Sequence, residues 1–176
     1  CLENNMYTII NIHWDGGWIE NNCTLDKQEE NNVKQHALWT QIATHFREYG
    51  ENLLFAGTNE PNVENATQMG VLNSYLQTFI DAVRSTGGNN SYRNIIIQGP
   101  STDISKTNEL MHTLPIDQAE DRLMMEIHYY SPWNFCGMEK DESWGRMFYF
   151  WGNGYHYEGS DRNANWGEED YVNAQF

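Results

Sequence analysis

The sequence predicts an α/β fold in which a parallel sheet is covered by helices. Four short apolar runs, each typical of a buried strand, alternate along the chain with longer segments of helical spacing. The runs are continuous rather than alternating with polar residues, as expected for strands of a parallel sheet that is covered on its faces. Strands that alternate with helices are joined by crossover connections and run parallel. No glycine-rich phosphate loop follows any run, which argues against a doubly wound nucleotide-binding sheet.

Residues 6–12 form the first expected strand, and a polar loop separates them from an expected helix over residues 27–49. Gly50 stands where a glycine that terminates a helix is expected. Apolar side chains recur through this helix at helical spacing, and they are Val33, Ala37, Leu38, Ile42, Phe46 and Tyr49. Trp39 lies among them in mid-helix, so we expect it in the core.

Residues 53–57 form the second expected strand, which ends at Pro61 because proline has no N–H to give to a neighbouring strand. A helix over residues 66–85 follows and ends at a Gly-Gly pair. Residues 93–100 form the third strand, and a shorter helix around residues 102–113 leads to the fourth strand, residues 123–129. The chain is then aromatic, glycine-rich and irregular as far as about residue 165, and another helix begins near residue 166.

The composition excludes several classes of partner. The 176 residues suffice for a single domain with its own core. A net charge of −15 argues against nucleic acid and against anionic membrane surfaces, and no apolar run is long enough to cross a membrane. Seven Trp and ten Tyr side chains suit neutral polar ligands with flat apolar faces, such as sugars. The three cysteines form no Cys-x-x-Cys pair, so neither a metal nor a cofactor is expected, and a Cys1–Cys23 disulfide stays open.

Polar residues suited to catalysis follow three of the four expected strands. His13 follows the first strand, Asn59 and Glu60 follow the second, and His128 and Tyr130 follow the fourth. The carboxyl ends of parallel strands meet at one edge of a sheet, where β/α barrels hold their active sites. A carboxyl such as Glu60 can donate a proton to a leaving oxygen. Taken singly, the Asn-Glu-Pro segment could instead cap the next helix, and each histidine could be structural. Their convergence favours a catalytic site.

Three segments carry a resemblance to a known family. Asn11-Ile12-His13, Thr58-Asn59-Glu60-Pro61 and Ile127-His128-Tyr129-Tyr130 resemble successive motifs of glycoside hydrolase family 5, a (β/α)8 TIM-barrel family of retaining β-glycanases. Their order and separation match strands three, four and six of that barrel, and residues 12–18 resemble the family's bacterial endo-β-1,4-glucanases. The resemblance covers nearly the whole chain. It implies a partial barrel, approximately strands three to six with their helices, in which residues 1–176 belong to a single catalytic domain.

The resemblance also implies an activity and a site. It implies hydrolysis of β-1,4-glucosidic bonds in cellulose or mixed β-glucan by a retaining double displacement, with Glu60 as the general acid/base. Asn59 would bind the sugar 2-hydroxyl, and His13, His128 and Tyr130 would line the subsite of the cleaved sugar. A retaining enzyme needs two carboxyl groups about 5–5.5 Å apart. The family's nucleophile is a Glu at the end of strand seven, beyond the helix in which this chain stops. We therefore expect the nucleophile outside this chain, which alone could be inactive.

Other groups receive lesser roles. Glu126 shares a face with His128 but lies one step deeper, so we expect it to hold a neighbouring polar residue rather than to attack. Trp18 and Trp133 are candidate platforms for pyranose rings. Within the enzyme class, mannan or xyloglucan could replace cellulose as the substrate.

A non-catalytic half-barrel is the alternative from another class. It would bind polysaccharide or associate with another chain through its open sheet edges. The resemblance further implies secretion to an extracellular or periplasmic location, although the chain carries no visible signal peptide and opens on Cys1.

Overall fold

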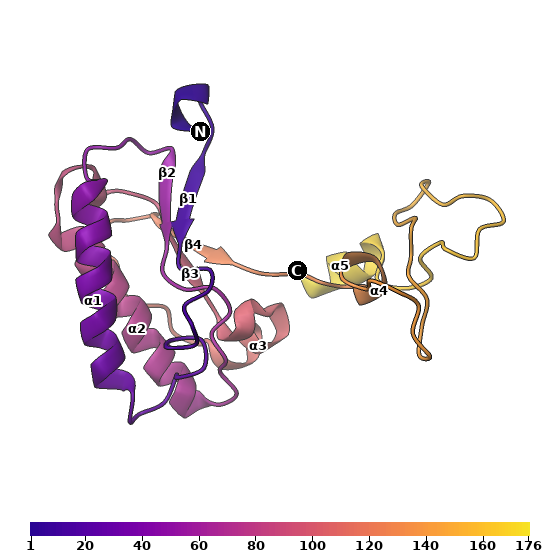
Figure 1. The fold of residues 1–176 in the computed structure, drawn as a ribbon, viewed down its shortest axis with the longest axis horizontal. Helices are drawn as coiled ribbons and strands as arrows, with labels where there is room; N and C mark the ends of the chain where they lie inside the picture. Colours follow the sequence, from indigo (N-terminus) through magenta and orange to yellow (C-terminus); the bar gives the residue numbers. More distant parts are fainter. The chain divides into compact units, whose positions relative to one another are not determined.

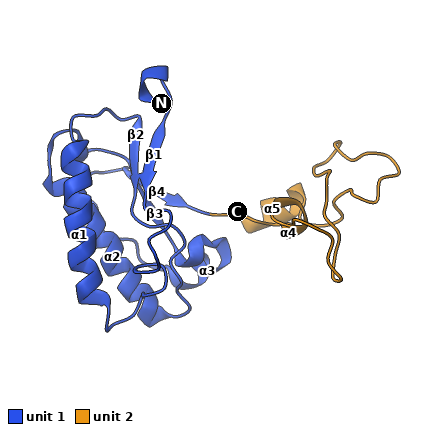
Figure 2. Ribbon diagram, viewed as in Figure 1, with its two compact units in different colours: residues 1–127 blue, residues 128–176 orange.

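The computed structural model describes residues 1–176, which form two compact units, Cys1–Ile127 and His128–Phe176 (Figure 2). The first unit contains all four strands, β1 (Thr8–Asn11), β2 (Leu53–Ala56), β3 (Ile95–Gln98) and β4 (Leu123–Glu126). Its α-helices are α1 (Gln28–His45), α2 (Ala66–Ser85) and α3 (Ile104–Leu110). The second unit contains the short helices α4 (Trp133–Cys136) and α5 (Glu169–Gln175). Every expected strand and helix is therefore present, and each expected strand is shorter than predicted.

The sheet of the first unit is fully parallel, with the strands adjacent in chain order (Figure 1). Right-handed crossovers that always step in the same direction leave their helices on the same face of a sheet. One large core cluster accordingly joins α1 and α2 to one face of β2 and β3. A doubly wound sheet would reverse its strand order and carry helices on both faces. The sheet thus has the arrangement of consecutive strands of a barrel.

The two faces of the sheet differ in burial. Phe55 and Ile95 point into the helix-covered core, whereas Leu54, Ala56 and Ile96 form a small cluster on the opposite face. We expected all four strands to be buried, and for the outer two this was wrong: Ile9 of β1 is 57% exposed and Met124 of β4 is 48% exposed. Each outer strand has only one neighbour, and helices cover only one face.

Helix α1 buries a different stripe from the one its apolar residues suggest. The buried residues are Asn31, Gln35, Trp39 and Ala43, one per turn, while Val33 is exposed. Val33 thus lies outside the buried stripe although it belongs to the apolar spacing, whereas the prediction that Trp39 lies in the core is confirmed. The buried amide nitrogens have partners: Asn31 Nδ2 donates to the Trp18 carbonyl at 2.6 Å, and Gln35 Nε2 donates to the Gly57 carbonyl at 3.1 Å. Gln35 Oε1 has no partner. The orientation of this helix thus combines the apolar burial of Trp39 and Ala43 with the hydrogen bonds of Asn31 and Gln35.

Helix α2 is the amphipathic helix that its sequence predicts. The Asn65 side chain caps it by accepting a hydrogen bond from the Gln68 N–H at 3.1 Å. Its buried face includes Leu72, Leu76 and Phe79, and the Phe79 ring lies 4.5 Å from the Trp39 ring. No helix of the chain is both long and apolar enough to cross a membrane.

Two glycines on and beside α2 give a matched pair of stability predictions. A Cβ at Gly57, just after β2, would lie 2.5 Å from the Phe79 ring, so Gly57→Ala should lower the free energy of unfolding by about 1–3 kcal/mol. Gly70 lies in the exposed face of α2, where an added Cβ would meet no atom within 4 Å, so Gly70→Ala should raise it by about 0.5–1 kcal/mol. Urea unfolding of both variants measures the change in the free energy of unfolding. A lower stability of Gly70→Ala would contradict the expectation that this position lies in an open, exposed part of α2.

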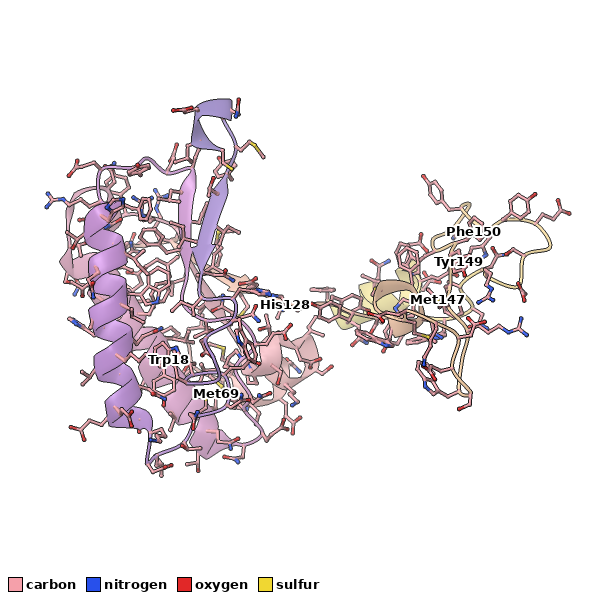
Figure 3. All side chains as sticks on the ribbon, in the orientation of Figure 1. Trp18, Met69, His128, Met147, Tyr149 and Phe150 are labelled. Carbon is pink, nitrogen blue, oxygen red and sulfur yellow. The ribbon has the colours of Figure 1, made fainter.

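Loops dominate the second unit, and hydrogen bonds hold them. Asn134 Nδ2 donates to the Arg146 carbonyl at 2.8 Å, and Arg162 donates to both carboxylate oxygens of Asp141. The hydrogen bond from Arg162 is the main cause that lowers the pKa of Asp141 to about 2. The Arg162 guanidinium also lies over the ring of Tyr149, 5.2 Å from its centroid. Tyr149 is labelled in Figure 3.

Candidate active site

The loop after β1 turns back on itself around Asp15. The Asp15 carboxylate accepts hydrogen bonds from the N–H groups of Gly17, Ile19 and Glu20. Gly16 and Gly17 both have positive φ, which glycine tolerates and which lets successive N–H groups converge on one carboxylate. This loop also carries His13 at its start, where the side chain is exposed.

The loop after β2 is fastened to this first loop. Asn62 N–H donates to the Glu20 carbonyl at 2.7 Å, and its side chain donates to Asn21 Oδ1 at 2.6 Å. These bonds hold the loop that carries Glu60 against the loop that follows His13. Burial raises the pKa of Glu20, as do the nearby Asp15 and Glu60 carboxylates, while His13 lowers it. His13, Glu20 and Glu60 are therefore close enough to interact electrically.

Asn59 presents a polar atom without a partner. Its Oδ1 is buried and accepts no hydrogen bond from the chain. A buried acceptor that lacks a donor costs free energy, so a donor from water or from a ligand would stabilise this atom. A sugar hydroxyl is a suitable donor. Asn59 and Glu60 are half-buried neighbours at the end of β2, as the sequence predicts.

Three further predicted residues form a group within the second unit. The Tyr130 ring packs edge-on against His128, with centroids 6.3 Å apart, and against Trp133, with centroids 6.0 Å apart. Tyr130 and Trp133 are about half exposed, so part of each side chain is accessible to solvent. The structure thus gathers the predicted residues into two sets, one in each unit.

Trp18 has a more restricted setting than an open platform. It lies against the core of the first unit (Figure 3), and the Lys34 ammonium lies 4.1 Å from its ring centroid. A cation over an indole face is favourable, and it occupies the surface that a pyranose would use. Any sugar contact of Trp18 therefore requires Lys34 to move or the other face or edge of the ring to be used.

Glu126 holds a polar neighbour, as predicted. Gln98 Nε2 donates to Glu126 Oε2 at 2.5 Å, on the sheet face opposite the helices. Gln98 is fully buried, and its Oε1 accepts from Thr58 in turn. This chain of bonds links the ends of β2, β3 and β4.

Comparison with known proteins identifies the family. The model of the cellulases, glycosyl hydrolase family 5, matches residues 1–173. The chain belongs to glycosyl hydrolase family 5. The resemblance inferred from the three strand-end motifs is therefore confirmed.

The relatives agree in sequence and in structure. A xyloglucan-specific endo-β-1,4-glucanase of Bacteroides ovatus is 41% identical over 160 residues, 84% of this chain and 31% of that protein. Endoglucanase A of Paenibacillus barcinonensis is 33% identical over 193 residues, 97% of this chain and 46% of that protein. A family 5 xyloglucan-specific β-1,4-glucanase from a ruminal metagenomic library, solved with a xyloglucan oligosaccharide, has a TM-score of 0.84 and 37% identity over 99% of this chain and 49% of its own.

The chain spans less than half of the length of these relatives. The near-complete coverage of this chain by solved family 5 structures confirms the α/β fold class and the partial TIM barrel.

Several residues that hold the loops carrying His13 and Glu60 were not predicted from the sequence, namely Asp15, Glu20, Gln98, Ser101 and Thr102. The sequence offered one signal, a lone Gln98 at the end of an otherwise apolar strand. Asp15 and Glu20 looked like ordinary loop acids, because their partners are backbone N–H groups and residues of another loop.

Glu20 gives a pH-dependent prediction. Its raised pKa means that the folded chain binds a proton there more tightly than the unfolded chain does. The associated stability is present at acid pH and is lost as the pH rises through the folded-state pKa. Glu20→Gln removes this loss, so the variant should gain in Tm over the wild type at about pH 7 and much less at about pH 4. Thermal unfolding at both pH values measures the Tm of the variant and of the wild type. An equal difference in Tm at the two pH values would contradict the raised pKa of Glu20.

Proposed function

We propose that this chain is part of a retaining glycoside hydrolase that cleaves β-1,4-glucosidic bonds in a β-glucan. The observation that carries the proposal is the place of Glu60 at the end of β2, next to the buried, unpaired Oδ1 of Asn59. Glu60 and His13 also both affect the pKa of Glu20, in the loop after β1. The family membership supports the reaction class. In this proposal residues 1–176 are part of a single catalytic domain, and the nucleophile is a carboxylate outside them.

Glu60 acts twice in the proposed mechanism. It first gives its proton to the glycosidic oxygen as the bond from that oxygen to C1 breaks, while the nucleophilic carboxylate attacks C1 from the opposite face. The resulting glycosyl ester is then hydrolysed: the Glu60 carboxylate takes a proton from a water, whose oxygen attacks C1 and releases the nucleophile. Configuration at C1 is inverted twice and so retained.

The surrounding residues bind the sugar in this proposal. Asn59 Oδ1 accepts a hydrogen bond from the 2-hydroxyl, and His13, His128 and Tyr130 line the subsite of the cleaved sugar. Trp133 is about half exposed and offers an indole face to a pyranose ring. Trp18 contributes only where Lys34 leaves its ring accessible.

Xyloglucan is the first substrate to test among the β-1,4-glucans. The relative with 41% identity is named as xyloglucan-specific, and a solved structure with 37% identity contains a xyloglucan oligosaccharide. Cellulose, mixed-linkage glucan and mannan are the alternatives. A polymer of this size is met outside the cytoplasm, so we propose an extracellular or periplasmic location for the protein.

The decisive experiment measures both turnover and stereochemistry. The full-length gene product is incubated with xyloglucan, carboxymethyl cellulose, mixed-linkage glucan and glucomannan, and new reducing ends are quantified. Proton NMR of the first product should show the β-anomer before mutarotation. Initial release of the α-anomer would overturn the retaining mechanism, and the absence of new reducing ends on every glucan would overturn the activity.

A second candidate rests on the exposed face of the sheet. Ile9 and Met124 are about half exposed there, and β1 and β4 are open sheet edges. Such surfaces favour self-association, so residues 1–176 alone could act as a non-catalytic half-barrel that pairs with another chain. Light scattering separates the cases: a dimeric mass of the isolated chain supports association, and a monomeric mass contradicts it.

A further inference from the structure

The turn between β3 and α3 is held in an unusual backbone conformation. Ser101 and Thr102 both have φ of 52°, in the left-handed region that favours glycine. Left-handed backbone is rare for a β-branched residue such as Thr102 and is energetically unfavourable for it. Conformations of this kind persist only where the surrounding contacts impose them.

The hydrogen bonds of this turn go to the residues on either side of Glu60. The Thr102 hydroxyl donates to the Asn59 carbonyl, and Ser101 N–H donates to the Pro61 carbonyl at 2.8 Å. Thr102 is fully buried. The turn therefore holds the backbone carbonyls of Asn59 and Pro61, the residues on either side of Glu60.

Gln98 holds the same segment one residue earlier. Its Oε1 accepts from the Thr58 N–H at 3.1 Å and from the Thr58 hydroxyl at 2.8 Å. A backbone N–H can only donate, so the amide oxygen of Gln98 must face Thr58 and its NH2 must face Glu126, as observed. The Thr58 N–H thereby sets the orientation of the Gln98 amide, and Glu126 accepts the hydrogen bond from its NH2.

The formation of α3 does not account for the strained turn. The Asp103 side chain caps α3 by accepting from the Lys106 N–H at 2.8 Å. Asp103 itself has an extended backbone. The helix therefore begins after the strained pair. The Ser101 N–H and the Thr102 hydroxyl donate to the segment after β2, whereas the Thr102 N–H donates to the Gly99 carbonyl within the turn and Ser101 Oγ accepts from Lys106 Nζ at 3.4 Å.

We propose that Gln98, Ser101 and Thr102 form a positioning clamp for the acid/base. The clamp fixes the backbone of residues 58–61 and, through it, the direction of the Glu60 carboxyl. This rests on the proposed function of Glu60. A displacement of about 1 Å in a reacting group can lower the rate by about 10²-fold. A turn that prevents such a displacement of Glu60 would therefore support catalysis even though its backbone is strained.

The test compares two variants at one buried position in the full-length gene product. Thr102→Val removes the hydroxyl and keeps the β-branched shape, whereas Thr102→Ser keeps the hydroxyl. Thr102→Val should lower kcat on a β-1,4-glucan by about 10- to 100-fold with little change in KM, and Thr102→Ser should retain most of the wild-type rate.

Two further readouts separate positioning from a general structural effect. An aryl β-glycoside with an acidic phenol as leaving group needs little help from a general acid, so Thr102→Val should impair its cleavage much less than that of the glucan. In the Glu60→Gln background, Thr102→Val should cause almost no further loss, because both changes remove the same function. Equal losses on the two substrates, or additive losses in the double variant, would overturn the clamp.

The clamp and the proposed function fail in different ways. Wild-type activity in Glu60→Gln would refute both the acid/base role of Glu60 and the clamp. Wild-type activity in Thr102→Val, with Glu60→Gln inactive, would refute only the clamp. Where Thr102→Val does not fold, Thr58→Val takes its place, because it removes one donor to Gln98 and keeps the shape. It should lower kcat by about 3- to 10-fold with the same dependence on leaving group, and an unchanged kcat would overturn the clamp.

Discussion

Glu60→Gln should lower kcat on a β-1,4-glucan by about 10²- to 10⁴-fold, the range that general acid–base catalysis supplies. The amide is nearly the same size as the carboxyl but has no acidic proton to give to the glycosidic oxygen. Cleavage of an aryl β-glycoside with a good leaving group should fall far less in its first step, because that step needs no proton. Release of the phenol, followed as a burst, measures this step separately.

Glu64→Gln is the matched control for this prediction. Glu64 lies four residues further along the same loop, its side chain is 65% exposed, and it pairs with Lys106 at the surface. An exposed ion pair contributes little to stability, so Glu64→Gln should leave both activity and Tm close to those of the wild type. If Glu60→Gln and Glu64→Gln were equally active, Glu60 would not be the acid/base.

The sequence predicted those features that depend on local pattern. Apolar runs located all four strands, and helical spacing with glycine and proline boundaries located the helices. The polar residues after β1 and β2 could be assigned to one edge, because parallel strands point their carboxyl ends the same way. His13 and Glu60 interact with the same carboxylate, that of Glu20, in agreement with that reasoning.

The features that escaped prediction depend on partners far apart in the chain. Asn31 and Gln35 are buried in α1 because backbone carbonyls of distant segments accept their amide hydrogens. Hydropathy alone would assign these positions to the surface and Val33 to the core, the reverse of what is observed. The hydrogen bonds of Gln98 are hidden for the same reason, since Thr58 lies 40 residues earlier and Glu126 lies 28 residues later.

Arg93 is the largest of these hidden contributors, and replacing it should have the largest effect on stability. The side chain is 1% exposed, and its guanidinium donates five hydrogen bonds, four of them to backbone carbonyls. Those carbonyls belong to Phe46, Tyr49, Gly50 and Leu53, which connect the end of α1 to the start of β2. Burial lowers the pKa of Arg93, and the nearby Arg84 lowers it further.

Arg93→Met should therefore lower the free energy of unfolding by roughly 3–5 kcal/mol, because it leaves several buried carbonyls without donors. The corresponding fall in Tm is on the order of 10 °C for a chain of this length. The free energy of unfolding of Arg93→Lys should lie between those of the wild type and Arg93→Met. An ammonium has three donors and cannot reproduce the planar fork of a guanidinium. Urea unfolding gives the free energies directly.

Arg47→Met separates the buried interactions from charge alone. Arg47 lies at the same end of α1, but its side chain is 48% exposed and pairs only with Glu48. Both variants remove one positive charge from a chain with a net charge of −15. If repulsion among the acidic residues were the cause, the two variants would lose equal stability. If desolvated carbonyls are the cause, Arg93→Met alone is strongly destabilised, and the connection from α1 to β2 depends on a residue that lies about 40 positions further along the chain.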